Sequence, residues 1–108
     1  MSDKRPIVAV DFDGVIHDSK HPEEGRKMGP PLPGALDAMQ DLYDSYYVII
    51  HTTMANTPRG RQVVADWLEH FDVDYHEIVG KPGANYYIDD RAIEHKDWKI
   101  TKQKLGLE

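Results

Sequence analysis

The sequence predicts an α/β fold, a single three-layer Rossmann-like domain in which a parallel sheet carries helices on both faces. Short apolar runs alternate along the chain with segments whose apolar residues recur at three- and four-residue steps. The 108 residues leave room for one domain and one core, and no internal repeat or linker divides them. We therefore treat residues 1–108 as one domain.

Four apolar runs predict the strands of the sheet. The first, Ile7 to Val10, is rich in β-branched residues and stops at Asp11, which favours a strand buried on both faces. The other three runs are short and are each bounded by polar or turn-forming residues. They cover residues 46–50, 77–79 and 84–88.

Helical periodicity predicts three helices, over residues 35–43, 58–70 and 98–105. Thr57 and Pro58 suit the N-cap and the first residue of the second helix. Residues 15–33 are rich in glycine and proline and predict a loop or small flap. Trp67 and Trp98 are expected to pack in the core.

Polar residues follow the predicted strands. Asp11 and Asp13 come after the first run, Thr52 after the second, and Asp89 and Asp90 after the fourth. In open parallel sheets, ligands bind beyond the carboxyl ends of the strands. We therefore expect these side chains to converge on one rim of the sheet.

The spacing of Asp11 and Asp13 indicates a site for a reaction at a phosphate group. They lie across a turn that Gly14 permits, and two such carboxylates repel unless a proton or a cation is bound. Mg²⁺ prefers oxygen ligands, and beside it an aspartate can attack phosphorus to form an acyl-phosphate. A calcium loop also begins with alternating acids, but its twelfth position needs Glu, and Pro22 stands there.

The ordered motifs resemble those of the haloacid dehalogenase (HAD) superfamily of phosphohydrolases over nearly the whole chain. That family begins with a strand and Asp-x-Asp-Gly, as in Asp11-Phe12-Asp13-Gly14. An apolar strand ending in Thr or Ser, a lysine and a pair of acids follow. The matching residues in this chain are Thr52, which is in the best register, with Thr53 as a possible substitute, then Lys81 in Gly80-Lys81-Pro82, and Asp89-Asp90.

The resemblance implies a HAD-like core and a Mg²⁺-dependent phosphatase that cleaves a phosphomonoester. Asp11 would be the nucleophile, forming an aspartyl-phosphate, and also a metal ligand. Asp13 would be the general acid/base, with its main-chain carbonyl on Mg²⁺.

The resemblance also implies how the phosphate and the metal are held. Thr52 or Thr53, together with Lys81, would bind the phosphoryl group. Asp89 or Asp90 would complete the metal site, and the sequence leaves open which of the two is the direct ligand.

Many members of that family carry a cap domain over the active site. The gaps at residues 15–33 and 55–80 are too short for one, so the site should be open apart from the flap. An open site suits a small phosphorylated substrate and also admits a phosphorylated macromolecule, unless another subunit of an oligomer covers it.

Two other function classes stay open. A receiver-type signalling module is also a small α/β domain with Mg²⁺, but its phosphorylated aspartate ends a central strand, whereas the run ending at Ile50 has no aspartate after it. A non-catalytic module could keep the metal site and act through a protein partner.

The composition limits the classes of partner and of chemistry that the protein can have. The net charge of −6 disfavours an extended nucleic-acid surface, and the absence of cysteine excludes disulfides and cysteine nucleophiles. The first apolar run is too short for a signal peptide or a membrane span, so we expect a cytoplasmic protein without membrane contact. The six histidines lack zinc spacing. His17 and His21 in the flap could touch substrate or solvent, and solvent is the expected place.

Overall fold

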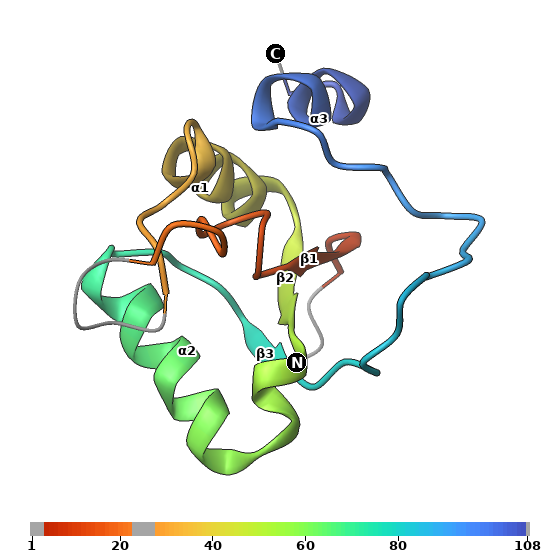
Figure 1. The fold of residues 1–108 in the computed structure, drawn as a ribbon. Helices are drawn as coiled ribbons and strands as arrows, with labels where there is room; N and C mark the ends of the chain where they lie inside the picture. Colours follow the sequence, from red (N-terminus) through yellow and green to blue (C-terminus); the bar gives the residue numbers. More distant parts are fainter. Residues whose placement is uncertain (1–3, 23–27, 108) are drawn as a thin grey trace.

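The computed structural model describes residues 4–22 and 28–107. Strands and helices alternate along the chain as expected for an α/β protein (Figure 1). In order, the elements are β1 (Ile7–Asp11), α1 (Ala35–Ser45), β2 (Tyr47–His51), η1 (Thr53–Asn56), α2 (Pro58–His70), β3 (Glu77–Val79) and α3 (Trp98–Leu105). Among them, η1 is a short 3₁₀ helix that the sequence did not predict.

The three strands form one parallel sheet in the order β1-β2-β3. Its register aligns Asp11 with His51, and His51 with Val79, so the carboxyl ends of all three strands are level. The α/β class and the parallel sheet are therefore confirmed, and the sheet edge at which ligands are expected is well defined.

Side chains at the helix starts explain where the helices begin. The Thr57 hydroxyl accepts a hydrogen bond from Gly60 N–H, with Pro58 as the first residue of α2. The Asp97 carboxylate accepts one from Ile100 N–H at the start of α3. Because such caps satisfy N–H groups that have no partner within the helix, they fix its first turn. The three predicted helices are confirmed.

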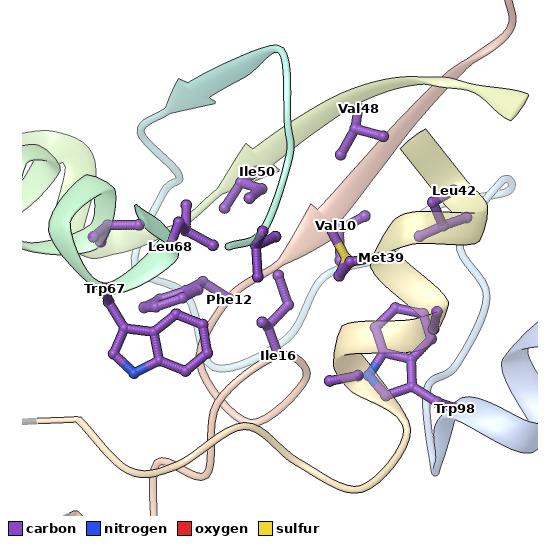
Figure 2. Packing of buried hydrophobic residues seen from close by; sticks show 14 of the residues in the cluster. Val10, Phe12, Ile16, Met39, Leu42, Val48, Ile50, Trp67, Leu68 and Trp98 are labelled. Atoms are coloured by element: carbon purple, nitrogen blue, oxygen red, sulfur yellow. The ribbon is translucent and has the colours of Figure 1, made fainter. Parts of the chain in front are cut away.

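One core joins the sheet to all three helices (Figure 2). Alternate residues of the two longer strands face it, and each helix contributes its apolar stripe. A fully buried side chain of this size contributes about 1.5–3 kcal/mol, so this core is the main source of stability. Its largest members include Phe12, Ile16, Met39, Leu42, Ile50, Trp67, Leu68 and Trp98.

The opposite face of β1 contradicts the expected three-layer arrangement. Ile7 is 67% exposed and Ala9 is also exposed, although both lie in a strand predicted to be buried on both faces. Within the described residues, no helix packs over these side chains. The prediction was wrong because an apolar run shows that a strand can be buried, but not that a second layer covers it.

The predicted fourth strand, over residues 84–88, is also absent from the described parts of the chain. Instead, the segment between β3 and α3 runs outside the sheet (Figure 1). Two local contacts hold it there: the Tyr87 hydroxyl donates to the Pro82 carbonyl, and Lys81 Nζ lies 4.2 Å from the centre of the Tyr87 ring. Ile88 is fully exposed as a result.

The described parts of the flap, residues 15–22 and 28–33, fold back on each other. Asp18 N–H donates to the Pro30 carbonyl, and Leu32 N–H donates to the Ile16 carbonyl. The middle of the predicted flap, residues 23–27, lies outside the described residues. In the part of the chain that is described, no helix is long and apolar enough to cross a membrane.

Candidate functional site

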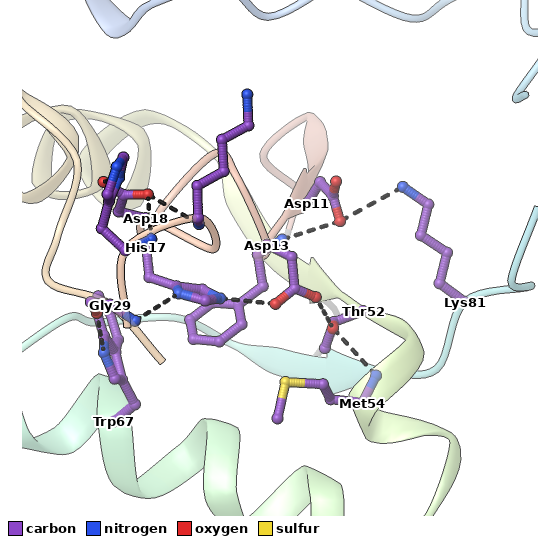
Figure 3. A network of polar contacts seen from close by, with 12 residues as sticks. Asp11, Asp13, His17, Asp18, Gly29, Thr52, Met54, Trp67 and Lys81 are labelled. Carbon is purple, nitrogen blue, oxygen red and sulfur yellow. Dashed lines mark hydrogen bonds and ion pairs between the residues drawn. The ribbon is translucent and has the colours of Figure 1, made fainter. Parts of the chain in front are cut away.

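The strand ends bring four of the predicted side chains to one place (Figure 3). Asp11 ends β1, Thr52 follows β2, and Lys81 comes shortly after β3. Asp13 reaches the same place because Thr52 donates a hydrogen bond to it across the sheet edge. The expected convergence is therefore found for Asp11, Asp13 and Thr52, and Lys81, which the resemblance named, joins them; the catalytic roles of all four stay predictions.

The Asp11 carboxylate is accessible and faces a cation. Its Oδ1 accepts a hydrogen bond of 3.1 Å from Phe12 N–H. Lys81 Nζ lies 3.6 Å from the same oxygen, and the Asp11 side chain is 38% exposed. A carboxylate in this setting can be reached by a ligand while a lysine offsets part of the added negative charge.

Both oxygens of Asp13 accept a hydrogen bond. His17 Nε2 lies 2.7 Å from Oδ1, and Thr52 Oγ1 donates to Oδ2 over 3.0 Å. The hydrogen bond from His17 lowers the pKa of Asp13 below its ordinary value, and this effect outweighs the opposing one of burial. Asp13 is therefore ionised at neutral pH, ready to take a proton, and must gain one before it can donate one.

His17 is buried, which contradicts its expected place in solvent. It is 2% exposed, because the returning part of the flap covers its ring and Gly29 N–H donates to its Nδ1 over 3.3 Å. Its ring also lies against Phe12, with the ring centres 4.5 Å apart. His21, by contrast, is exposed as expected. His17 follows Asp13 by four positions, and this spacing alone does not predict the contact, which forms because the backbone of the flap pairs with itself.

The structure distinguishes the two candidate threonines. Thr52 is fully buried, and its hydroxyl both donates to Asp13 and accepts from Met54 N–H over 3.2 Å. Thr53 is exposed at the start of η1. A phosphate could bind the Thr52 hydroxyl only by displacing one of these bonds, whereas Thr53 is exposed.

Lys81 is held by its main chain. The Asn56 side chain accepts a hydrogen bond from Lys81 N–H over 3.0 Å and donates one to the Lys81 carbonyl over 2.9 Å. Gly80 leaves space for this contact, since a Cβ atom there would collide with Asn56 Oδ1. Sequence reasoning missed Asn56, because an asparagine in a loop carries no signal about a partner 25 residues away.

His51 is paired with Asp11 in the sheet register, and burial and the charges of Lys81 and Asp11 all affect its pKa. Burial is the main cause that lowers the pKa of His51 below 6.5, and the charge of Lys81 lowers it further. Asp11 acts in the opposite direction. The imidazole is therefore neutral near pH 7 and adds no positive charge to the site.

Asp89 and Asp90 are not brought to this site. Both are exposed on the segment that runs outside the sheet, and Asp89 Oδ1 accepts a hydrogen bond from Arg91 N–H over 2.8 Å. Residues 4–22 and 28–107 contain no cluster of three or more histidine or acidic side chains able to hold a metal ion. The donor types of Asp11 and Asp13 still fit Mg²⁺, which is commonly bound by one or two carboxylates together with water and phosphate.

Comparison with known proteins supports the fold. A crystal structure of a structural-genomics target from Vibrio cholerae is similar, with a TM-score of 0.66 and 22% sequence identity over 82% of each chain. At this identity, the likeness concerns the fold alone. Neither the protein-family models nor the curated protein sequences gave a match.

A groove that the structure does show lies apart from the strand-end side chains. A groove of about 570 Å³ runs between α2 and β3 and is lined by residues such as Arg61 and Glu77. Asn56 borders this groove, but none of the predicted catalytic, phosphate-binding or metal-binding residues does. We therefore assign the groove no part in the chemistry of the strand ends.

Proposed function

We propose that the protein is a HAD-type, Mg²⁺-dependent phosphatase that cleaves a phosphomonoester through an aspartyl-phosphate on Asp11. One observation carries the proposal. Two segments far apart in the sequence contribute an accessible carboxylate, a lysine 3.6 Å from it and a second, hydrogen-bonded carboxylate at the same sheet edge. Such a set matches the needs of phosphoryl transfer, in which positioning and charge compensation do most of the work.

Each of these residues has a defined part in the reaction. Once Asp13 has gained a proton from solvent, an Asp11 oxygen attacks phosphorus, the bond from phosphorus to the ester oxygen breaks, and the leaving oxygen takes that proton from Asp13. Water then attacks the phosphorus of the aspartyl-phosphate, its proton passes to Asp13, and the Asp11 carboxylate is restored with release of phosphate. Lys81 offsets the charge on the phosphoryl oxygens, and Thr53 supplies a hydroxyl that can bind them.

The metal-binding part of the proposal involves Asp11 and Asp13. The Asp11 carboxylate and the Asp13 main-chain carbonyl are the donors at the strand end, and Mg²⁺ bound there would supply further charge compensation. Asp89 or Asp90 would join only after the segment over residues 84–90 approached β1. The outer edge of β1 has no strand partner in the described residues, so that side of the sheet is open to it.

The open position of the site extends the proposal to substrates. Asp11 is reached directly from solvent, so the enzyme would accept either a small phosphorylated compound or a phosphate on a macromolecule. We place this activity in the cytoplasm, as the sequence suggests.

A binding module without catalysis is the second candidate. The distance of Asp89 and Asp90 from the strand ends favours it, because a third metal-binding carboxylate is then missing. A receiver-like module is less well supported: β2 is the central strand, and it ends at His51 and Thr52 rather than at an aspartate.

Phosphate release from a broad phosphomonoester panel tests the proposal, with Mg²⁺ and with EDTA. We expect Mg²⁺-dependent turnover that Asp11→Asn lowers by about 10³-fold or more, since the nucleophile is lost. Asp74→Asn, a change in an exposed loop carboxylate, is the matched control and should leave turnover intact. Turnover unaffected by Asp11→Asn would refute the mechanism. No turnover with any compound, together with retained Mg²⁺ binding, would favour the binding module.

A further inference from the structure

His17 is a buried polar side chain for which the motif resemblance gives no function. It lies in the flap rather than at a strand end, and it is 2% exposed. Both of its ring nitrogens nevertheless have partners, Asp13 on one side and Gly29 on the other. A buried imidazole whose two nitrogens are both engaged has a fixed orientation.

The partners also define which nitrogen carries the hydrogen. A main-chain N–H can only donate, so Nδ1 of His17 must accept from Gly29 and carries no hydrogen. The hydrogen of the neutral ring is then on Nε2, which donates to Asp13 Oδ1 over 2.7 Å. The structure thus predicts one tautomer of His17.

A continuous chain of hydrogen bonds passes through this ring (Figure 3). Trp67 Nε1 of α2 donates to the Gly29 carbonyl over 3.1 Å, and Gly29 N–H donates to His17. His17 donates to one oxygen of Asp13, while Thr52 donates to the other. The chain therefore connects helix α2, the flap and the end of β2 to a single carboxylate.

Two donors on two oxygens fix the plane of the Asp13 carboxylate. Each carboxylate oxygen can accept about two hydrogen bonds, so a further one is left on each oxygen for a ligand or water. The Asp13 side chain is 36% exposed, so that capacity can be used. Because the Asp13 carboxylate is already oriented, the reaction does not lose rate through a step in which this group must first be oriented.

Gly29 makes the flap part of this arrangement. It lies in the returning part of the flap, next to Pro30, whose carbonyl accepts from Asp18 N–H. A Cβ atom at residue 29 would collide with the Asp18 carbonyl, so only glycine lets the two parts of the flap approach this closely. The closed base of the flap and the orientation of His17 are thus linked.

We propose that His17 is a positioning residue for the proposed phosphatase reaction, holding the Asp13 carboxylate against Thr52 and tying it to the base of the flap. This inference rests on the proposed function, because it assigns His17 a part in that reaction. His17 itself does not exchange a proton with substrate. Its effect is on the fraction of time in which Asp13 has the productive orientation.

Two substitutions test the two ring nitrogens of His17 separately. In His17→Gln, the amide nitrogen can stand where Nε2 stands and donate to Asp13. In His17→Asn, the shorter amide can keep the bond from Gly29 but does not reach Asp13. We expect His17→Asn to lower kcat by roughly 10–100-fold with little change in KM, and His17→Gln to restore most of the loss.

The control is His21→Asn, because His21 is an exposed histidine in the same flap, and its kcat should equal that of the wild type. Thermal unfolding of each variant shows whether a loss of rate reflects a loss of fold. The ¹⁵N chemical shifts of the wild-type imidazoles give a readout independent of activity, and His17 should show an unprotonated Nδ1 at neutral pH.

The outcomes distinguish this inference from the proposed function. If the wild type releases no phosphate from any compound, both fall. If it does, and folded His17→Asn has the wild-type kcat or Nδ1 carries the hydrogen, only the positioning proposal is overturned. A rate lost in His17→Asn and recovered in His17→Gln supports it, since both substitutions disturb the packing around the ring.

Discussion

Asp11 and Asp13 are separated by one residue, but their carboxylates have different partners. Asp11 is paired with Lys81 over 3.6 Å and is 38% exposed, whereas Asp13 has a donor from a buried histidine and another from a buried threonine. The first carboxylate can therefore change partners when a ligand arrives, while the second keeps its orientation. This difference agrees with the assignment of Asp11 as nucleophile and Asp13 as acid/base.

The pKa of His51 reports on the position of Lys81. Since the charge of Lys81 lowers this pKa and that of Asp11 raises it, Lys81→Gln should raise the His51 pKa toward 6.5, and Asp11→Asn should lower it further. An NMR titration of the His51 imidazole measures both shifts. Lys104→Gln, an exposed change on α3, should leave the value unchanged. An unchanged pKa in Lys81→Gln would show that Lys81 lies elsewhere in solution.

The same shift gives a pH dependence of stability. Because the pKa of His51 is lower in the folded state, the unfolded chain takes up this proton first as the pH falls below 6.5. The contribution of neutral His51 to stability is thus complete above pH 6.5 and decreases below it. His51→Gln should remove this part of the pH dependence in urea unfolding curves.

At the scale of elements, Asn56 joins η1, which follows β2, to the loop after β3. Gly80→Ala would force the added Cβ against the Asn56 amide, and the strain should cost about 1–3 kcal/mol of unfolding free energy. Activity should fall with it, because Lys81 follows directly. Urea unfolding and phosphate release measure the two effects.

Gly83→Ala is the matched control for Gly80→Ala. Its Cβ would meet no described atom closer than Thr53 Cγ2 at 3.9 Å, which is ordinary contact. Its stability should equal that of the wild type or exceed it slightly, because alanine restricts the unfolded chain. Equal losses in the two variants would contradict the role given to Asn56.

The helices and the paired strands could be predicted from sequence because their signals are local. Thr57 and Pro58 mark a helix start whatever the rest of the chain does, and the run over residues 46–50 fits a buried central strand. The run over residues 84–88 shares two tyrosines and an isoleucine with it. Its structure depends on contacts with Pro82 and Lys81, which a periodicity does not contain.

The residues of the candidate site likewise fall into those that the sequence could predict and those that it could not. Asp11, Asp13 and Thr52 were predictable because parallel strands bring their carboxyl ends together, whereas Lys81 was named only through the family resemblance. His17 and Asn56 were not, because each acts through a hydrogen bond to a loop whose path only the fold defines. The hydroxyl exposed to a ligand, that of Thr53 rather than Thr52, likewise depends on which one Asp13 already engages.

At the scale of the whole molecule, one face of the sheet is packed and the segment between β3 and α3 lies outside it. Ile88 is fully exposed there, so Ile88→Ser should change the unfolding free energy by no more than about 0.5 kcal/mol. Ile50→Ala, in the core, should cost about 2–5 kcal/mol. Urea unfolding compares the two directly.

A larger loss in Ile88→Ser, above about 1 kcal/mol, would show that residue 88 is buried in solution. In that case the segment would pack against the sheet, and Asp89 and Asp90 would be nearer the strand ends than the structure places them. The same measurement therefore bears on the stability of the molecule and on the metal-binding part of the proposed function.

The two hydrogen bonds between the Asn56 side chain and the main chain of residue 81 affect which substitutions the loop can accept. Both hydrogen bonds go to main-chain atoms, so they would persist whatever side chain residue 81 carried. The path of the loop is thereby separated from the charge it presents to Asp11. Another side chain at residue 81 would therefore occupy the same position at the strand ends. A single substitution there could change the chemistry of this sheet edge without changing the path of the loop.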